Sequence, residues 1–468
     1  MRFIDLFAGL GGFHAALQQL GHECVFASEL DDELRSIYRR NFPEMESRTF
    51  GDIRDMKDLV PAHEILCAGF PCQPFSKSGA QLGVQDETRG TLFHEILEIL
   101  DRRRPPYVIL ENVGNFERHD GGRTWDVVKS RLERLDYNVR GTEHIGSGGH
   151  GLISPHHLGY PHTRERFYIV ASQEPLPADP FPIGDRGRIT SFGSHVLDSS
   201  ELSEQDRKET ALTEQQINCV NLWNELIQGI PERVAIPGYP IWGDELDASY
   251  PYENCTPFTA DLETLRLSIP GAGGSESREE LLLRLPSYAR TRIETFPTWK
   301  IDFIRTSRNW FREINPFIPH QWRERLRGLP PSLRKLEWNC QGEERDLWKY
   351  VLQFRPSGLR TKRYTSIPAL VAMTTTQIPI LGPERRFLAR TEGLRLQGFR
   401  DNHELPRSHA AAFKALGNAV HVGVVREIAQ WLLERRGSPK ESAMAARPKS
   451  PAVQISLSLP HARMRATA

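Results

Sequence analysis

Cysteines and long apolar runs are scarce in this sequence, and each scarcity argues against a class of protein. The 468 residues include only six cysteines, which form no CxxC pair and are too few for a disulfide framework, so we expect reduced thiols and no structural zinc. No run approaches the ~20 consecutive apolar residues of a membrane-spanning helix, so a membrane protein is not expected. Asp5 and the glycine turn at Gly9 leave no room for a signal-peptide core. We therefore expect a cytoplasmic protein.

A net charge is also lacking, but the balance of 60 basic and 60 acidic residues conceals a division along the chain. Residues 172–283 hold 20 acidic and 7 basic side chains, a net of −13, whereas residues 284–363 hold 18 basic and 8 acidic, a net of +10. Arginines interleaved with aromatic residues favour a surface that neutralises phosphates and stacks on bases. The alternative is a folded domain that buries the aromatic residues and carries arginine on its outer face. The aromatic residues in question are Trp299, Phe303, Trp310, Phe311, Trp322, Trp338, Trp348 and Tyr350.

The first 170 residues alternate short apolar runs with helical patterns, which predicts an α/β fold with a mostly parallel sheet. A proline-rich change of texture after residue 172 indicates a boundary, and the Ser-, Ala- and Pro-rich residues 437–468 are typical of a disordered tail. The strands are expected near residues 2–7, 23–28, 64–68, 106–110 and 166–171, with helices over 92–103, 125–135 and 408–436.

A glycine turn follows the first expected strand, and Glu29 ends the second one, twenty residues after Gly9. Glycines allow the backbone to approach a ligand closely, and a carboxylate at this position can accept hydrogen bonds from both ribose hydroxyls. His14 stands where a dinucleotide fingerprint needs its third glycine, so a mononucleoside cofactor such as S-adenosylmethionine fits better than a nicotinamide dinucleotide. Asp52 has the spacing of a group at the end of the third strand, where it could meet an adenine amino group.

Cys72 lies in the segment Gly69–Ser76, after an apolar strand and between two prolines. That position is on the carboxyl edge of the sheet, where open α/β folds bind ligands. A free cysteine is more often a buried structural residue, but the flanking prolines favour an exposed loop and therefore a nucleophilic thiolate.

Together these residues resemble the DNA (cytosine-5) methyltransferases over residues 1–171 and about 385–435, with the motifs in the family's order. The segments that carry the resemblance are Phe7–Gly12, Glu29, Asp52-Ile53, Gly69–Ser76, Arg89–Phe93, Glu111–Val113, Arg164–Tyr168, Arg395–Phe399 and Gly417–Val420. The resemblance implies a Rossmann-like, S-adenosylmethionine-dependent methyltransferase sheet with an inserted target-recognition domain. It places the catalytic and cofactor-binding domain at 1–171, the recognition domain at 172–387 and a return segment at 388–436.

The resemblance also assigns roles to individual residues. Cys72 is the nucleophile that adds to C6 of a flipped cytosine, Glu111 stabilises the adduct at N3, and Arg166 with Arg164 holds the O2 edge. The cofactor contacts it implies are Phe7, Gly9, Leu10, Gly11, Glu29, Asp52, Ile53, Pro71, Leu92 and Asn418. The expected DNA contacts are Gln73 and Ser76, together with Arg355, Arg360, Lys362 and Arg363 of a cationic turn.

The expected activity is site-specific methylation of double-stranded DNA in the cytoplasm, in association with the nucleoid, by a monomer that produces S-adenosylhomocysteine. A separate cognate restriction endonuclease is the partner that the resemblance implies. Two other functions stay open from the sequence: an RNA cytosine-5 methyltransferase with the same motifs, and a DNA-binding regulator without catalysis. His162 departs from the glutamine usual in the family, and we expect it to alter contacts near the flipped nucleotide.

Overall fold

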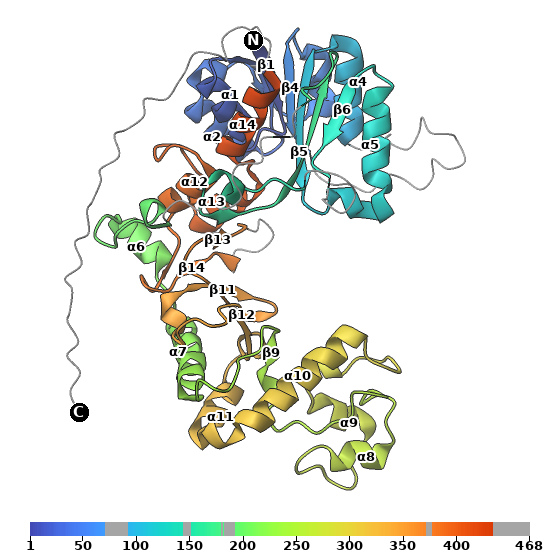
Figure 1. Ribbon diagram of the computed structural model, residues 1–468, viewed down its shortest axis with the longest axis vertical. Helices are drawn as coiled ribbons and strands as arrows, with labels where there is room; N and C mark the ends of the chain where they lie inside the picture. Colours follow the sequence, from blue (N-terminus) through green and yellow to red (C-terminus); the bar gives the residue numbers. More distant parts are fainter. Residues whose placement is uncertain (71–91, 144–150, 179–180, 182–191, 371–376, 434–468) are drawn as a thin grey trace, which may run out of the picture.

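Two large sheets organise the computed structural model, one at an end of the elongated molecule and one nearer its middle (Figure 1). The structure describes residues 1–70, 92–143, 151–178, 181, 192–370 and 377–433. Among these residues no helix is both long and apolar enough to cross a membrane.

The first sheet has seven strands in the order β3-β2-β1-β4-β5-β8-β6, and its first five strands run parallel. β8 is antiparallel to both of its neighbours, so the sheet is parallel at its centre and mixed at one edge. The expected strands and the mostly parallel arrangement are confirmed. Its strands are β1 (Arg2–Leu6), β2 (Glu23–Ser28), β3 (Thr49–Phe50), β4 (Ile65–Gly69), β5 (Tyr107–Val113), β6 (Asn138–Gly141) and β8 (Arg166–Ser172).

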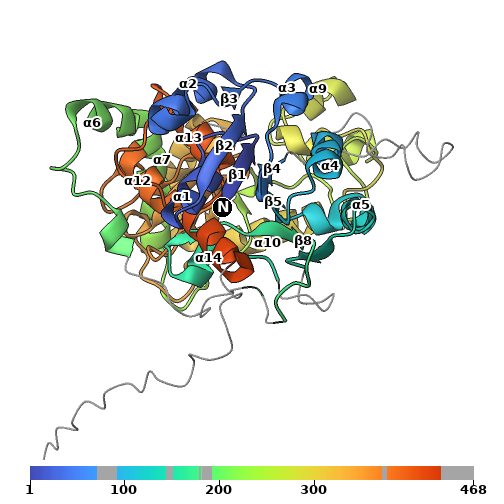
Figure 2. The same ribbon diagram turned by 90° about the horizontal axis from the view of Figure 1, so that it is seen from above.

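Helices cover both faces of this sheet, because its central strands are apolar on both sides. In β1, Phe3 belongs to the hydrophobic core on one face of the sheet, and Ile4 belongs to the core on the opposite face. Each core is covered by its own group of helices. Figure 2 shows the two groups on opposite sides of β1 and β4. The first group is α1 (Gly12–Gln19), α2 (Asp32–Asn41), α13 (His409–Asn418) and α14 (Val422–Leu433); the second is α3 (Ile53–Met56), α4 (Leu92–Arg103) and α5 (Arg123–Glu133).

The single helix expected over residues 408–436 is wrong. The chain leaves helical geometry after Asn418, Ala419 is extended, and a new helix begins at Val422. At the break, the carbonyl groups of Gly417 and Ala419, which have no partner within a helix, accept hydrogen bonds from the guanidinium of Arg164.

The second sheet has six strands in the order β15-β14-β11-β12-β10-β9. β11 and β12 form a hairpin, so the cationic segment 355–363 contains the expected turn. The strands are β9 (Ile241–Trp242), β10 (Lys335–Trp338), β11 (Val351–Arg355), β12 (Gly358–Lys362), β14 (Ile380–Leu381) and β15 (Arg386–Phe387). The helices around it are α6 (Glu204–Thr210), α7 (Glu214–Gly229), α8 (Leu262–Leu267), α9 (Arg278–Leu283), α10 (Thr298–Ile314) and α11 (His320–Gly328).

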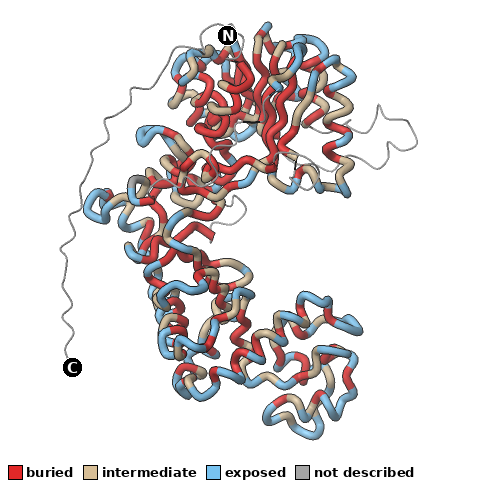
Figure 3. The backbone as a smooth tube through the Cα atoms, viewed as in Figure 1, coloured by how far each residue is buried: buried red, intermediate tan, exposed pale blue. Residues whose placement is uncertain are grey.

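The second sheet and the helices around it form the lower region of the molecule. Most aromatic residues of the basic segment belong to its hydrophobic core, and Figure 3 shows this region with many buried segments. The expectation that they stack on bases is therefore wrong for these residues, and the alternative, a folded domain with arginine outside, is the one observed. Two of these residues are exceptions: 55% of the surface of Trp299 is exposed, and Phe303 is only partly buried. The buried side chains are Trp310, Phe311, Trp322, Trp338, Trp348 and Tyr350.

Two connections join the lower region to the upper one. Strand β7 (His162–Thr163) pairs with β13 (Ile367–Pro368). At the start of α12 (Arg390–Gln397), the buried carboxylate of Glu392 binds the guanidinium of Arg386 at 2.8 Å and accepts the backbone N–H of Leu197 at 2.9 Å. Removing one partner of a buried ion pair leaves the other charge uncompensated.

We expect Glu392→Ala to lower the free energy of unfolding by about 3 to 5 kcal/mol, because Arg386 would stay buried without its partner. Urea denaturation followed by circular dichroism measures the change. Glu225→Ala is the matched control, because Glu225 pairs with Arg325 at the surface and its loss should cost about 1 kcal/mol or less. Equal effects of the two substitutions would contradict the structural role of Glu392.

Candidate active site

The glycine turn after β1 brings the backbone to Glu29 at the carboxyl edge of the sheet. Phe7, Gly9 and Gly11 all have positive φ angles, of 57°, 53° and 78°. The N–H of Gly9 donates to Oε2 of Glu29 at 2.7 Å, and the N–H of Asp31 donates to Oε1 at 2.9 Å. Each carboxylate oxygen keeps a second lone pair, which suits the ribose interaction that the sequence predicts.

The same turn tolerates no side chain where α1 begins. A Cβ on Gly11 would collide with the ring of Phe42, and one on Gly12 would lie 2.6 Å from Cγ2 of Val420. The return segment therefore lies directly against the turn. His403 adds a second contact from the same segment, because its Nε2 donates to the carbonyl of Leu10 at 2.9 Å.

Glu111 lies near the end of β5, beside Arg166 of the antiparallel strand β8. Nε of Arg166 is 3.1 Å from Oε1 of Glu111, and the carboxylate side chain is 9% exposed. Burial raises the pKa of Glu111 above its ordinary value, while the guanidinium groups of Arg166 and Arg164 oppose this rise. A carboxyl group in this state can carry a proton to a bound base more readily than an ordinary glutamate.

Arg164 has a different environment from Arg166. It is only 2% exposed, and its Nη2 donates to the carbonyls of Gly417 and Ala419, each at 2.9 Å. Burial, assisted by the neighbouring Arg166, lowers its pKa, but a guanidinium stays protonated at neutral pH. Arg164 thus holds the return segment beside Glu111.

These groups surround one cavity of about 330 Å³. The structure brings seven of the predicted residues to its wall: Phe7, Gly9, Glu29, Glu111, Arg164, Arg166 and Asn418. Sequence reasoning did not assign Phe13, Leu34 or Asn112 to the site. Asn112 donates from its buried amide to the carbonyl of Phe70 at 2.9 Å, and its place next to Glu111 was the signal available for it. Phe13 and Leu34 look like ordinary helix core residues in sequence.

Other predicted cofactor residues lie outside the wall of this cavity. Leu10 and Ile53 are buried in the two cores, and Leu92 begins α4. Asp52 caps α3, and its hydrogen bond with Arg54 lowers the pKa of its carboxyl group. Pro71, Cys72, Gln73 and Ser76 fall outside the described residues, so their roles stay predictions.

The predicted DNA-contacting cations lie on and just after the β11–β12 hairpin, away from the cavity wall. Arg360 forms an ion pair with Glu337 at 3.0 Å. Arg363 follows β12 and pairs with Glu343 at 2.7 Å, with both side chains largely exposed. The four cations therefore do not share one environment.

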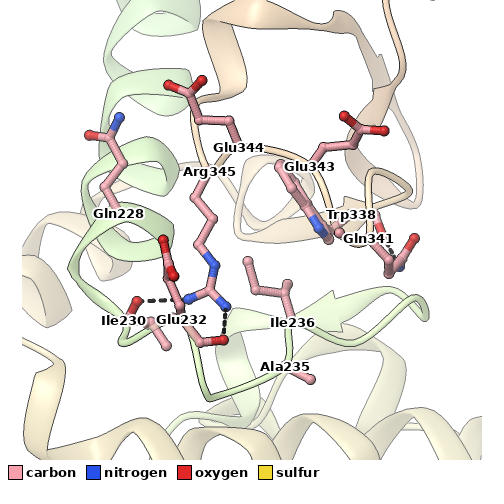
Figure 4. Close-up of a pocket in the computed structure, with 11 residues that line it drawn as sticks. Gln228, Ile230, Glu232, Ala235, Ile236, Trp338, Gln341, Glu343, Glu344 and Arg345 are labelled. Carbon is pink, nitrogen blue, oxygen red and sulfur yellow. Dashed lines mark hydrogen bonds between the residues drawn. The ribbon is translucent and has the colours of Figure 1, made fainter. Parts of the chain in front are cut away.

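A second cavity, of about 770 Å³, lies between the end of α7 and the loop after β10 (Figure 4). The guanidinium of Arg345 faces the chain segment that follows α7 and donates to the carbonyls of Ile230 at 2.7 Å and Val234 at 2.6 Å. The other charged side chains of the wall are Glu232, Glu343 and Glu344. This acidic wall does not suit a DNA phosphate. In the described part of the chain, no cluster of three His, Cys, Asp or Glu side chains is placed to hold a metal ion.

The family model for C-5 cytosine-specific DNA methylases matches residues 1–233 and 291–434. The type II methyltransferase M.AluI of Cellulosimicrobium cellulans is 34% identical over 91% of this chain and 90% of its own length. M.HhaI of Haemophilus parahaemolyticus is 39% identical over 46% of this chain and 64% of its own length. M.MspI of a Moraxella species is 41% identical over 36% of this chain and 38% of its own length.

The chain therefore belongs to the C-5 cytosine-specific DNA methylase family. It is a DNA (cytosine-5)-methyltransferase of the bacterial restriction-modification type, which confirms the predicted fold class, family and reaction. Membership also decides for DNA over RNA and for an enzyme over a regulator. The unmatched residues 234–290 contain α8 and α9.

The family and the fold imply S-adenosylmethionine as cofactor, and the cavity has suitable groups for it. The carboxylate of Glu29 suits a ribose, and the rings of Phe7 and Phe13 provide apolar surface for a nucleoside. Glu111 and Arg166 lie in the wall of the same cavity, so a base placed against them would share it with the cofactor.

We expect Arg164→Ala to lower the free energy of unfolding by about 2 to 4 kcal/mol, because two buried carbonyls lose a charged donor. Amide exchange near Ala419 and Val420 should become faster, as mass spectrometry would show. Arg426→Ala is the control, because Arg426 lies on α14 and its pair with Glu427 is partly exposed. Unchanged exchange in the Arg164 variant would contradict this anchoring role.

Proposed function

We propose that this enzyme methylates C5 of a target cytosine within a specific DNA sequence through the residues gathered around the cavity. The observation that carries this proposal is the placement of Glu29, Glu111 and Arg166 on one cavity wall in a member of this family. S-adenosylmethionine, when bound, supplies an electrophilic methyl group on sulfur.

C5 of cytosine is a poor nucleophile, so the ring has to be activated first. In the proposed reaction the thiolate of Cys72 forms a bond to C6 and electron density moves to C5, while protonated Glu111 donates to N3. Arg166, assisted by Arg164 behind it, holds the O2 edge of the base. After C5 has taken the methyl group it loses its proton, the bond from sulfur to C6 breaks, and 5-methylcytosine leaves.

A stacked base cannot meet these groups, so the target cytosine has to leave the duplex. Unstacking costs a few kcal/mol, which contacts elsewhere must offset. We propose that residues 172–387 form the target-recognition domain that makes these contacts. Arg355, Arg360 and Lys362 on the β11–β12 hairpin are its proposed DNA-binding cations.

We further propose that the enzyme acts as a monomer and protects DNA from a separate restriction endonuclease. Mapping methylated cytosines in DNA from cells that express the protein tests activity and reports the sequence recognised. Sequencing the neighbouring genes tests for the endonuclease.

We expect Cys72→Ala to abolish methyl transfer while DNA binding survives. A duplex with 5-fluorocytosine at the target should trap the wild-type enzyme as a covalent adduct, because fluorine prevents loss of a proton from C5. Cys255→Ala should form the adduct normally, since Cys255 lies in the segment that the family model does not match. Adduct formation by the Cys72 variant would refute this mechanism.

The raised pKa of Glu111 predicts a pH dependence. The acid form of Glu111 is lost as pH rises through this pKa, so the rate of methyl transfer should fall with rising pH. This fall is the alkaline limb of the pH–rate profile. Arg166→Gln removes a charge that lowers the pKa, so the limb should move to higher pH. Glu111→Gln should abolish the limb and slow the reaction by about 10²- to 10⁴-fold. Single-turnover rates against pH measure this, and a limb at the same pH in the Arg166 variant would contradict the assignment.

A further inference from the structure

The second sheet has one apolar face and one polar face. The register aligns Glu337 of β10 with Arg360 of β12, and Arg360 with Gln353 of β11. The intervening apolar residues Leu336, Trp338, Leu352, Phe354 and Leu359 belong to the core of the lower region, and on the opposite face only Val351, at the start of β11, is apolar and buried. Residues two apart in a strand share a face. The polar face therefore carries Lys335, Glu337, Gln353, Arg355, Arg360 and Lys362.

Arg360 is held in place on this face. Its Nε is 3.0 Å from Oε1 of Glu337, with the two side chains 25% and 14% exposed. The amide of Asn339 donates to the same carboxylate oxygen at 2.9 Å. Nε of Arg360 is buried beside this carboxylate in an ion-pair contact without hydrogen-bond geometry, and the Nη donors are available for another partner. A long side chain oriented in this way loses little further conformational freedom on binding.

The polar face extends toward the catalytic residues. Lys362 is the next residue on the face of β12, and burial together with Arg360 lowers its pKa. The carboxylate of Glu165, between Arg164 and Arg166, is close enough to oppose this shift. Figure 1 shows β11 and β12 between the first sheet and the helices α10 and α11.

The chemistry of this face differs from that of a phosphate-binding surface. Phosphate contacts need positive charge and tolerate mobile side chains, whereas base edges need donors and acceptors in fixed positions. Arg360, Glu337 and Asn339 form a mixed and oriented set. Arg363, exposed and paired with Glu343, lacks this setting.

We propose that Arg360, oriented by Glu337, reads a guanine of the recognition sequence through O6 and N7 in the major groove. This inference rests on the proposed function and assigns the reading of one base to one side chain. A bidentate arginine is the geometry that matches these two acceptors. Glu337 is then a positioning residue.

The test replaces each guanine of the mapped recognition sequence in turn by 7-deazaguanine, which lacks the N7 acceptor. For the wild-type enzyme, kcat/KM should fall on the order of 10-fold or more at one guanine. Arg360→Lys keeps the positive charge but not the bidentate geometry. It should lower kcat/KM on natural DNA by on the order of 10- to 100-fold and should no longer respond to 7-deazaguanine at that position. Glu337→Gln should give a smaller loss with a reduced response.

Arg325→Lys and Glu225→Gln are matched controls, because they alter an exposed ion pair on α11 and α7 and should retain the full 7-deazaguanine effect. The proposal is overturned if no guanine is sensitive in the wild-type enzyme, a result that does not depend on any variant folding. It is also overturned if Arg360→Lys keeps the full sensitivity at every guanine. A wild-type enzyme that transfers no methyl group at all would instead refute the proposed function.

Discussion

The cavity depends on the buried guanidinium of Arg164. It joins the link between β7 and β8 to a segment more than 250 residues later, through the carbonyls of Gly417 and Ala419. The contact lies where α13 ends and three residues before Val422 begins α14, and the intervening Val420 lies against Gly12. Because the carbonyls are buried, the charge that satisfies them cannot be removed without cost. Glu111 and the glycine turn consequently share one cavity wall.

Buried charge also organises the region that we propose reads DNA. Glu392 ties the return segment to Arg386 and to the backbone of Leu197, so the second sheet is attached to the segment that closes the active site. Away from β15 in the same sheet, Glu337 of β10 orients Arg360 of β12. In both places a carboxylate limits the positions that an arginine can occupy, which is what precise placement of a base requires.

Much of the first sheet was predictable, because parallel strands buried on both faces are continuous apolar runs between helical patterns. The helix 92–103 has the predicted limits. The strand expected before Asp52 is β3, whereas β6 and β7 were not predicted, since they are short or carry few apolar residues. The prediction that the aromatic residues of the basic segment stack on bases was wrong because composition does not show burial. Trp322 and Trp338 are both enclosed in the core.

By itself the sequence determined the family and the reaction, because the expected nucleophile, acid and cofactor turn are local motifs whose order is visible without coordinates. Only the tertiary structure distinguished the surroundings of the two arginines, with Arg166 beside Glu111 and Arg164 bound to backbone carbonyls, since the two residues are close together and look alike in sequence. It also showed His162 fully buried, with Nδ1 3.0 Å from the carbonyl of Leu396, rather than on the cavity wall described here. Such assignments depend on contacts between residues distant in the chain, and a linear pattern carries no record of them.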